Sequence, residues 1–319
     1  MAPPNRLETT FRAARMYYED GHTMESIAST LDVSRSTVSR MLRDAREEGL
    51  VQISLHPPGA PRLEELRRTI SHRYRVRAHV VAVPPAAGER ERLQSVAAAG
   101  AAVLEDLLEP GMTVGMAWGT TVSALVAQLR PRPTPGLRIV QLNGAIDTEG
   151  AGLTYVSAML TRAAELWDAT VHHFPVPAFF DYADTRAAMW RERSVQRVLA
   201  TQQQCTLAVF GVGAFEAEVP SHVYTNNYLA PADLASLRAD GAVGDVCTVF
   251  LRADGTYRDI AMNQRRSGPD PSQLAGIPHR LLVASGRSKS LPLRAALRAG
   301  VATDIVVDEV TAAGLLALR

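Results

Sequence analysis

The chain has 319 residues, a length that suits two or three domains rather than one small core. Its formal net charge is +1, which excludes a globally basic protein that coats nucleic acid without specificity, so any DNA binding must come from a local patch. The only cysteines are Cys205 and Cys247, too few for a disulfide scaffold or a cysteine zinc site. We expect a cytosolic, cytoplasmic protein without a membrane partner, because the first twenty residues lack an apolar signal core and no stretch approaches the roughly 20 apolar residues of a membrane helix.

The first fifty residues predict a helix-turn-helix. Between residues 7 and 20, apolar side chains recur at helical spacing and predict a first helix. These side chains are Phe11, Ala14 and Tyr18. Thr23 is a suitable N-cap for a short helix over residues 24–31, and Ser34 caps a longer helix that stops at Gly49. Two helices joined by a tight connection, the second longer and hydroxylated at its start, are typical of a helix-turn-helix.

The helix that follows Ser34 carries arginines and hydroxyls on one side and apolar residues on the other. Major-groove recognition requires short donors and cations, and hydroxyls beside free amides at a helix start suit phosphate oxygens. The candidate DNA-binding residues are Ser34, Arg35, Ser36, Thr37, Ser39, Arg40 and Arg43. The alternative is the solvated face of an ordinary helical hairpin, but such faces usually mix acidic with basic residues, and here acidic residues appear only in the second half of the helix. Double-stranded operator DNA is therefore the expected partner.

A proline- and glycine-rich stretch, residues 57–61, predicts a linker. It separates a helix-turn-helix DNA-binding domain over residues 1–56, which ends in a short strand or wing, from an effector and oligomerisation domain over residues 62–319. The helix after the linker carries Leu63, Leu66 and Ile70 at helical spacing, and either joins the domains or pairs with another subunit.

Apolar strand-like runs then alternate with amphipathic helices to the end of the chain. One of these helices, rich in arginine, is expected near residues 189–199. Such alternation predicts an α/β domain with a mostly parallel sheet covered on both faces.

Two strand ends are candidates for binding a ligand. "VGMAWGTTV" is an apolar strand that ends in Gly119, Thr120 and Thr121, where glycine lets an oxyanion approach and hydroxyls and helix amides donate to it. A glycine turn with threonine caps is the structural alternative. "QLNGAI" places Asn143 and Gly144 at another strand end, fit for hydroxyl or phosphate contacts or for a plain turn. Parallel sheets bind ligands at these carboxyl ends.

Lys289 is the only lysine among 34 basic residues. It lies between a strand and a helix, where a compact ammonium suits a phosphate monoester; the survival of one surface lysine by chance is the alternative. Trp118 is a candidate wall of the same pocket, although a tryptophan at a strand end is more often a core residue. Neighbouring His172 and His173 point to opposite faces of a strand, so we expect no metal site. "FGVGAF" lacks a dinucleotide fingerprint, so we expect no cofactor.

The segment "MYYEDGHTMESIASTLDVSRSTVSRMLRDAREEGLVQI" resembles the N-terminal domain of the SorC family of bacterial sugar-responsive transcriptional regulators. "TVGMAWGTT", "IVQLNGAI", "FGVGAF" and "GAVGDV" follow in the family's order, so the resemblance spans nearly the whole chain. It implies a Rossmann-like α/β effector domain of the sugar-phosphate isomerase and deaminase type. It also implies a phosphorylated sugar or polyol as effector and a homo-oligomer, either dimer or tetramer. In the family, the matching lysine, Lys289 here, lines the effector pocket, and Asp245 lies near the sugar hydroxyls.

These observations predict a DNA-binding transcriptional regulator of a carbohydrate catabolic operon, controlled by a phosphorylated sugar or polyol. The alternative is a sugar-phosphate isomerase or deaminase fused to a helical module. Such an enzyme needs a placed general base and acid. Asp245, Asp308 and Glu309 are candidates, but no paired acidic motif is evident, so we expect no enzyme.

Overall fold

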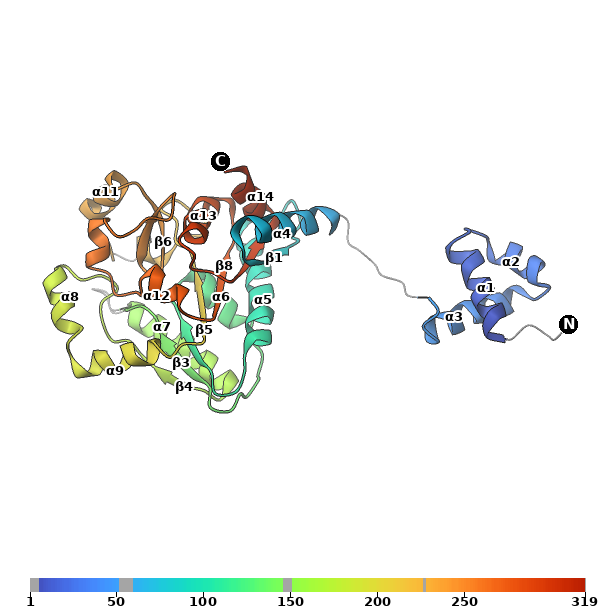
Figure 1. Cartoon of the computed structure of the whole chain (residues 1–319), viewed down its shortest axis with the longest axis horizontal. Helices are drawn as coiled ribbons and strands as arrows, with labels where there is room; N and C mark the ends of the chain where they lie inside the picture. Colours follow the sequence, from blue (N-terminus) through green and yellow to red (C-terminus); the bar gives the residue numbers. More distant parts are fainter. Residues whose placement is uncertain (1–5, 52–59, 146–150, 226–227, 319) are drawn as a thin grey trace. The chain divides into compact units, whose positions relative to one another are not determined.

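The computed structural model describes residues 6–51, 60–145, 151–225 and 228–318, and the chain divides into two compact units, Met1–Ala60 and Pro61–Arg319 (Figure 1). Within the described residues, no helix combines the length and apolar character needed to span a bilayer. Most of the wing expected before residue 57, and most of the linker, lie outside these ranges. The last two residues expected in the linker, Ala60 and Pro61, instead begin helix α4 (Ala60–Tyr74). Proline fits the first turn of a helix, where its missing amide hydrogen costs nothing.

Three helices build the first unit, and their caps are those that the sequence predicts. They are α1 (Arg6–Tyr18), α2 (Met24–Leu31) and α3 (Arg35–Glu47). The Ser26 amide donates to the Thr23 hydroxyl at 3.2 Å, and the Thr37 amide donates to the Ser34 hydroxyl at 3.1 Å. Asp32 adopts a left-handed conformation between α2 and α3, with φ of 52°, which turns the chain sharply. The predicted helix-turn-helix is therefore confirmed.

The core of this unit is small and consists mainly of alanine and aliphatic side chains. Its fully or nearly buried members are Ala13, Ala14, Met16, Ile27, Val38, Leu42 and Ala45. Of the three apolar residues that predicted α1, only Ala14 is among them. Phe11 is 50% exposed and Tyr18 is 39% exposed, so the buried face of α1 is rotated away from the aromatic residues.

The second unit contains a seven-stranded sheet in which every neighbouring pair is parallel. In spatial order the strands are β1 (Arg77–Val81), β9 (Asp304–Asp308), β8 (His279–Ala284), β5 (Leu207–Gly211), β2 (Thr113–Met116), β3 (Arg138–Gln141) and β4 (Thr170–His172). Side chains alternate between two cores, so that Val209 of β5 faces one layer of helices and Phe210 faces the other.

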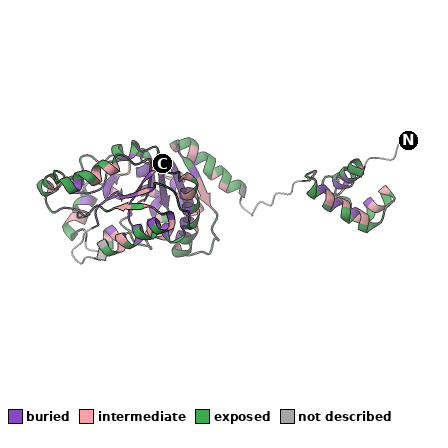
Figure 2. Cartoon of the chain, turned by 90° about the horizontal axis from the view of Figure 1, so that it is seen from below, coloured by how far each residue is buried: buried purple, intermediate pink, exposed green. Residues whose placement is uncertain are grey.

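Helices cover both faces of the sheet, as the sequence predicts. One face packs against α5 (Glu89–Leu107), α6 (Thr120–Ala127) and α7 (Ala151–Trp167). The other face packs against α4, α9 (Arg193–Gln202), α12 (Pro271–Ala275), α13 (Ser290–Arg298) and α14 (Glu309–Ala317). Figure 2 shows the strands almost wholly buried and the outer sides of the helices exposed. The expected α/β class is confirmed.

The arginine-rich helix expected near residues 189–199 is wrong in its boundaries. The chain instead forms α8 (Ala183–Met189) and α9, with a break at residues 190–192. Trp190 lies at this break, and its ring packs edge-on against both Phe174 and Phe180 at centroid distances of 5.7 Å. Such edge-to-face contacts stabilise buried aromatic clusters.

A small antiparallel sheet lies beside the parallel one, formed by β6 (Ala242–Val246) and β7 (Val249–Arg252). Cys247 and Thr248 join these strands with φ of 49° and 67°, the signs that a two-residue hairpin turn requires. Asp245 lies inside β6, where it also bridges to Gly213 beyond the end of β5. Two short helices, α10 (His222–Thr225) and α11 (Pro231–Ala239), precede this hairpin.

Candidate functional site

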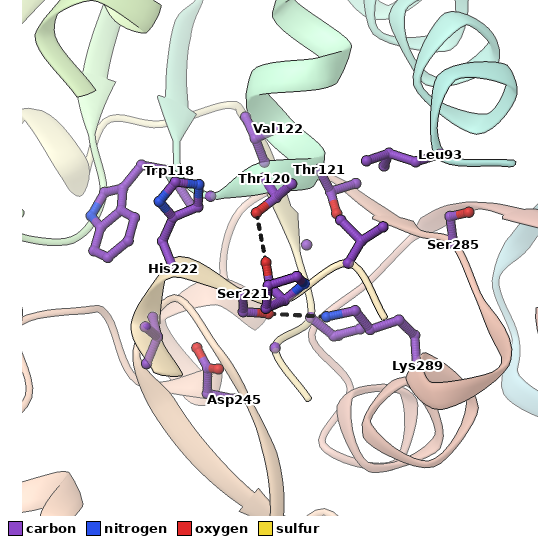
Figure 3. Close-up of a pocket in the computed structure, with 18 of the residues that line it drawn as sticks. Leu93, Trp118, Thr120, Thr121, Val122, Ser221, His222, Asp245, Ser285 and Lys289 are labelled. Carbon is purple, nitrogen blue, oxygen red and sulfur yellow. Dashed lines mark hydrogen bonds between the residues drawn. The ribbon is translucent and has the colours of Figure 1, made fainter. Parts of the chain in front are cut away.

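A pocket opens at the carboxyl ends of four adjacent strands, β8, β5, β2 and β3 (Figure 3). Between β5 and β2 the strand order changes direction: the chain runs outward from β2 through β3 to β4, and from β5 through β8 to β9. Loops on the two sides diverge at such a point and leave a crevice, which is where open α/β sheets bind ligands. Lys289, Asp245, Asn143 and residues 118–121, predicted from separate motifs, all line this one pocket.

Helix α6 presents its N-terminus to the pocket. Gly119, the residue before it, has φ of 143°, a conformation that favours glycine, and no described side chain caps the amides of the first turn. The Thr120 hydroxyl donates to the carbonyl of Pro220 at 3.0 Å, while Thr121 lines the pocket. Uncapped amides and the helix dipole make this end suitable for an anion.

Lys289 lies opposite, at the start of α13. It is 6% exposed, and its ammonium donates to the Ser221 hydroxyl at 3.0 Å (Figure 3). Burial lowers the pKa of Lys289 to about 8, while the carboxylates of Asp245 and Glu89 oppose that fall. A cation held this deep is costly unless an anion compensates it, and Lys289 does not lie on the surface.

Asp245 is 5% exposed and both its oxygens already accept hydrogen bonds. The Tyr224 hydroxyl donates to one oxygen at 2.7 Å and the Thr248 amide to the other at 3.1 Å. Burial raises the pKa of Asp245, although these hydrogen bonds and the charge of Lys289 oppose the rise. The carboxylate is therefore fixed in orientation, and its remaining lone pairs can accept ligand hydroxyls.

Two buried polar atoms in the pocket have no hydrogen-bond partner among the described residues. They are the side-chain oxygen of Asn143 and the hydroxyl of Ser285, whose residues are 2% and 8% exposed. Buried polar atoms normally find partners, so these two are available to a ligand. Gly144, in contrast, does not line the pocket. Its backbone packs so closely against the carbonyls of Val176 and Pro177 that a side chain at this position would collide with them.

Aromatic rings form one wall. The Trp118 indole N–H donates to the Gly144 carbonyl at 2.8 Å, and the Trp118 ring lies 5.2 Å from the Tyr228 ring. The indole N–H is therefore satisfied within the protein, while the side chain lines the pocket. His222 stacks on Tyr155 at 4.7 Å, and burial lowers the pKa of His222. This wall is therefore uncharged near neutral pH.

The exposed face of α3 retains the predicted cations, with different surroundings for each. Arg35 pairs with Glu25 of α2 at 3.0 Å, and Arg43 lies 3.9 Å from Glu47. Within the described part of the chain, Arg40 makes no ion pair. At the start of the helix, the Ser34 hydroxyl contacts those of Ser36 at 2.7 Å and Thr37 at 2.8 Å, so these three hydroxyls form one polar cluster. Ser39 is exposed on the same helix.

Comparison with known proteins identifies both units. Residues 61–317 match the family described as "Putative sugar-binding domain", and residues 5–53 match a homeodomain-like helix-turn-helix family. The deoxyribonucleoside regulator of Bacillus subtilis is 30% identical, with 97% of each chain covered, and the sorbitol operon regulator of Klebsiella pneumoniae is 25% identical, with 96% of each chain covered. The chain belongs to the SorC family of transcriptional regulators.

Solved structures agree with this SorC-family assignment. A domain of a "possible sugar-binding transcriptional regulator" from Arthrobacter aurescens is 43% identical and has a TM-score of 0.76, covering 80% of this chain and 98% of that chain. Full-length SorC from Klebsiella pneumoniae shares the fold, with a TM-score of 0.71 at 22% identity, covering 98% of this chain and 100% of that chain. The SorC-family chain is thus a transcriptional regulator with a helix-turn-helix and a sugar-binding domain.

The same findings decide against the enzyme alternative. The matching families and relatives are transcriptional regulators, not isomerases or deaminases. Of the proposed acids, Asp308 caps α14 by accepting from the amides of Val310 and Thr311, which is a structural role. No group of three metal-ligating side chains occurs in the residues that the structure describes.

Among the residues of the SorC-family pocket that sequence reasoning missed are the polar residues Glu89, Ser221, His222 and Ser285. Ser285 could have been found, because it directly follows β8 in the same loop as Lys289. Ser221 and His222 come from a segment that follows no strand motif, and Glu89 from the start of α5. Only tertiary contacts bring these three to the carboxyl edge of the sheet.

Proposed function

We propose that this regulator controls a carbohydrate catabolic operon in the cytoplasm. It binds double-stranded operator DNA as a homo-oligomer, dimer or tetramer, and a phosphorylated sugar or polyol in the pocket changes its affinity for the operator. The observation that carries the effector assignment is the buried Lys289 ammonium in the same pocket as the uncapped N-terminus of α6. A phosphate dianion compensates both features at once.

The phosphate and the sugar use different parts of the pocket in this proposal. Lys289, the amides at residues 119–121 and the Thr121 hydroxyl hold the phosphate. The fixed Asp245 carboxylate accepts hydrogen bonds from sugar hydroxyls. The oxygens of Asn143 and Ser285, which have no partner among the described residues, are available for further hydrogen bonds to the sugar. Trp118 supplies an apolar wall, as sugar sites often have.

The DNA-binding assignment rests on α3. Its exposed face carries Arg35, Arg40 and Arg43 beside the hydroxyls of Ser34, Ser36, Thr37 and Ser39. Residues 1–56 form the DNA-binding domain and residues 62–319 the effector and oligomerisation domain, with 57–61 between them. One helix-turn-helix contacts few bases, which is why two half-sites and at least a dimer are proposed.

Calorimetry on the full chain with pairs of sugars and their monophosphates tests the effector class. The phosphorylated member of the recognised pair should bind at least about tenfold more tightly, because a charge-assisted contact contributes about 1.5–3 kcal/mol. Lys289→Ala should remove this preference. Arg287→Ala, which removes an exposed cation from the same loop, should keep it. Equal affinity for the free sugar and its phosphate would contradict the proposal.

A further inference from the structure

Glu89 adds a negative charge to a pocket proposed to bind an anion. It is the first residue of α5 and lines the pocket together with Lys289 and Thr120. Its carboxylate packs against Gly286, where any side chain would overlap it, and the backbone amide of Arg287 donates to it. Glu89 is thereby held at the loop that carries Lys289.

The described residues that line the pocket carry more carboxylates than cations, so the pocket does not favour anions in general. Among the described residues of its lining, Lys289 is the one cation, and Glu89 and Asp245 are two carboxylates. Burial raises the pKa of Glu89, and the nearby charges of the exposed Glu218 and of Asp308 raise it further. Asp245 is buried and already accepts two hydrogen bonds, whereas Glu89 is only partly buried. A ligand that places one phosphate at Lys289 and α6 therefore shares the pocket with two carboxylates and, among the described lining residues, with no second lysine or arginine.

We propose that Glu89 restricts the pocket to ligands that carry a single phosphate. This inference rests on the proposed phosphate site and deepens it. A first phosphate gains Lys289 and the α6 amides, but a second one meets the Glu89 charge with no further lysine or arginine in the described lining to compensate it. Hydroxyl groups of a ligand, in contrast, can donate to the same carboxylate. Glu89 thus penalises a ligand with a second phosphate while accepting a hydroxylated one.

Orthophosphate and pyrophosphate, which carry one and two phosphate groups, test the role of Glu89 without requiring the sugar to be identified. Their association constants are measured by calorimetry with the full chain near neutral pH, at constant ionic strength, for wild type, Glu89→Gln and Glu91→Gln. The Glu89→Gln change keeps an acceptor for the Arg287 amide and removes only the charge. Glu91 is the matched control: it is exposed in the first turn of the same helix and outside the pocket lining.

Wild type should bind pyrophosphate no more tightly than orthophosphate. Glu89→Gln should raise the ratio of pyrophosphate to orthophosphate affinity by about tenfold, as expected for removing a like charge from a partly buried site, and Glu91→Gln should leave the ratio unchanged. An unchanged ratio in Glu89→Gln, with orthophosphate binding that Lys289→Ala abolishes, would overturn the role of Glu89 alone. Orthophosphate binding that is absent, or indifferent to Lys289→Ala, would overturn the phosphate site and this inference with it.

Discussion

Lys289 carries its charge where burial opposes it, and this gives effector binding a pH dependence. The pKa of the ammonium is lowered from 10.5 to about 8, chiefly by burial. Below that pH the side chain is protonated and attracts a phosphate; above it the charge is lost. Phosphate affinity should therefore fall as the pH rises through about 8.

Calorimetric titrations of a sugar monophosphate between about pH 7 and pH 9 measure this fall, since the phosphate itself is already a dianion over most of that range. Lys289→Met should bind weakly with little pH dependence and serves as the control. Constant wild-type affinity across the range would show that the Lys289 charge does not contribute to binding.

The pocket was predictable wherever its residues follow parallel strands. Trp118, residues 119–121 and Asn143 come directly after β2 and β3, and Lys289 follows the loop after β8, so strand ends alone bring them to one edge. Asp245 was placed by family resemblance, and its position inside a hairpin was not foreseen. One partner that fixes it, Thr248, is a local contact within the hairpin turn, whereas the other, Tyr224, comes from α10 and is brought there only by tertiary packing.

Helix α3 is the element that we propose recognises the operator, and its arginines are not equivalent. Arg35 and Arg43 have acidic neighbours, whereas Arg40 makes no ion pair within the described residues. Arg40 can therefore contact DNA without first breaking an ion pair to another described residue. We expect Arg40→Ala to weaken specific operator binding by about 1–3 kcal/mol with the fold unchanged.

Mobility-shift titrations with circular dichroism measure this loss. Arg46→Ala is the matched control, because it removes an exposed arginine from the last turn of the same helix. It should weaken binding far less, since the N-terminal part of a recognition helix contacts the bases. An equal loss in both variants would mean that α3 contributes only diffuse charge, not a specific contact.

Element boundaries were predictable where caps mark them, as at Thr23 and Ser34, because a cap is a local interaction between neighbouring residues. They were not predictable where packing decides. Trp190, which follows α8, packs against two rings that precede the helix, and the exposed Phe11 shows that helical spacing finds a helix without finding its buried face.

The architecture of the chain was predictable because apolar strands alternate with amphipathic helices, a pattern that allows few folds other than a covered parallel sheet. Regulation needs more than two folded units: we propose that the effector binds one oligomeric arrangement better than another, which by linkage would change operator affinity. The central claim is therefore that a phosphate bound at Lys289 changes DNA binding at α3.

Operator affinity of the full chain, measured with and without the recognised sugar phosphate, tests this claim most directly. For wild type and Arg287→Ala, the effector should change operator affinity by roughly five- to 150-fold, the range of ordinary allosteric coupling. Lys289→Ala should bind the operator like wild type without effector, because α3 is untouched, and should not respond to effector. A Lys289→Ala protein that responds at the wild-type effector concentration would contradict the account.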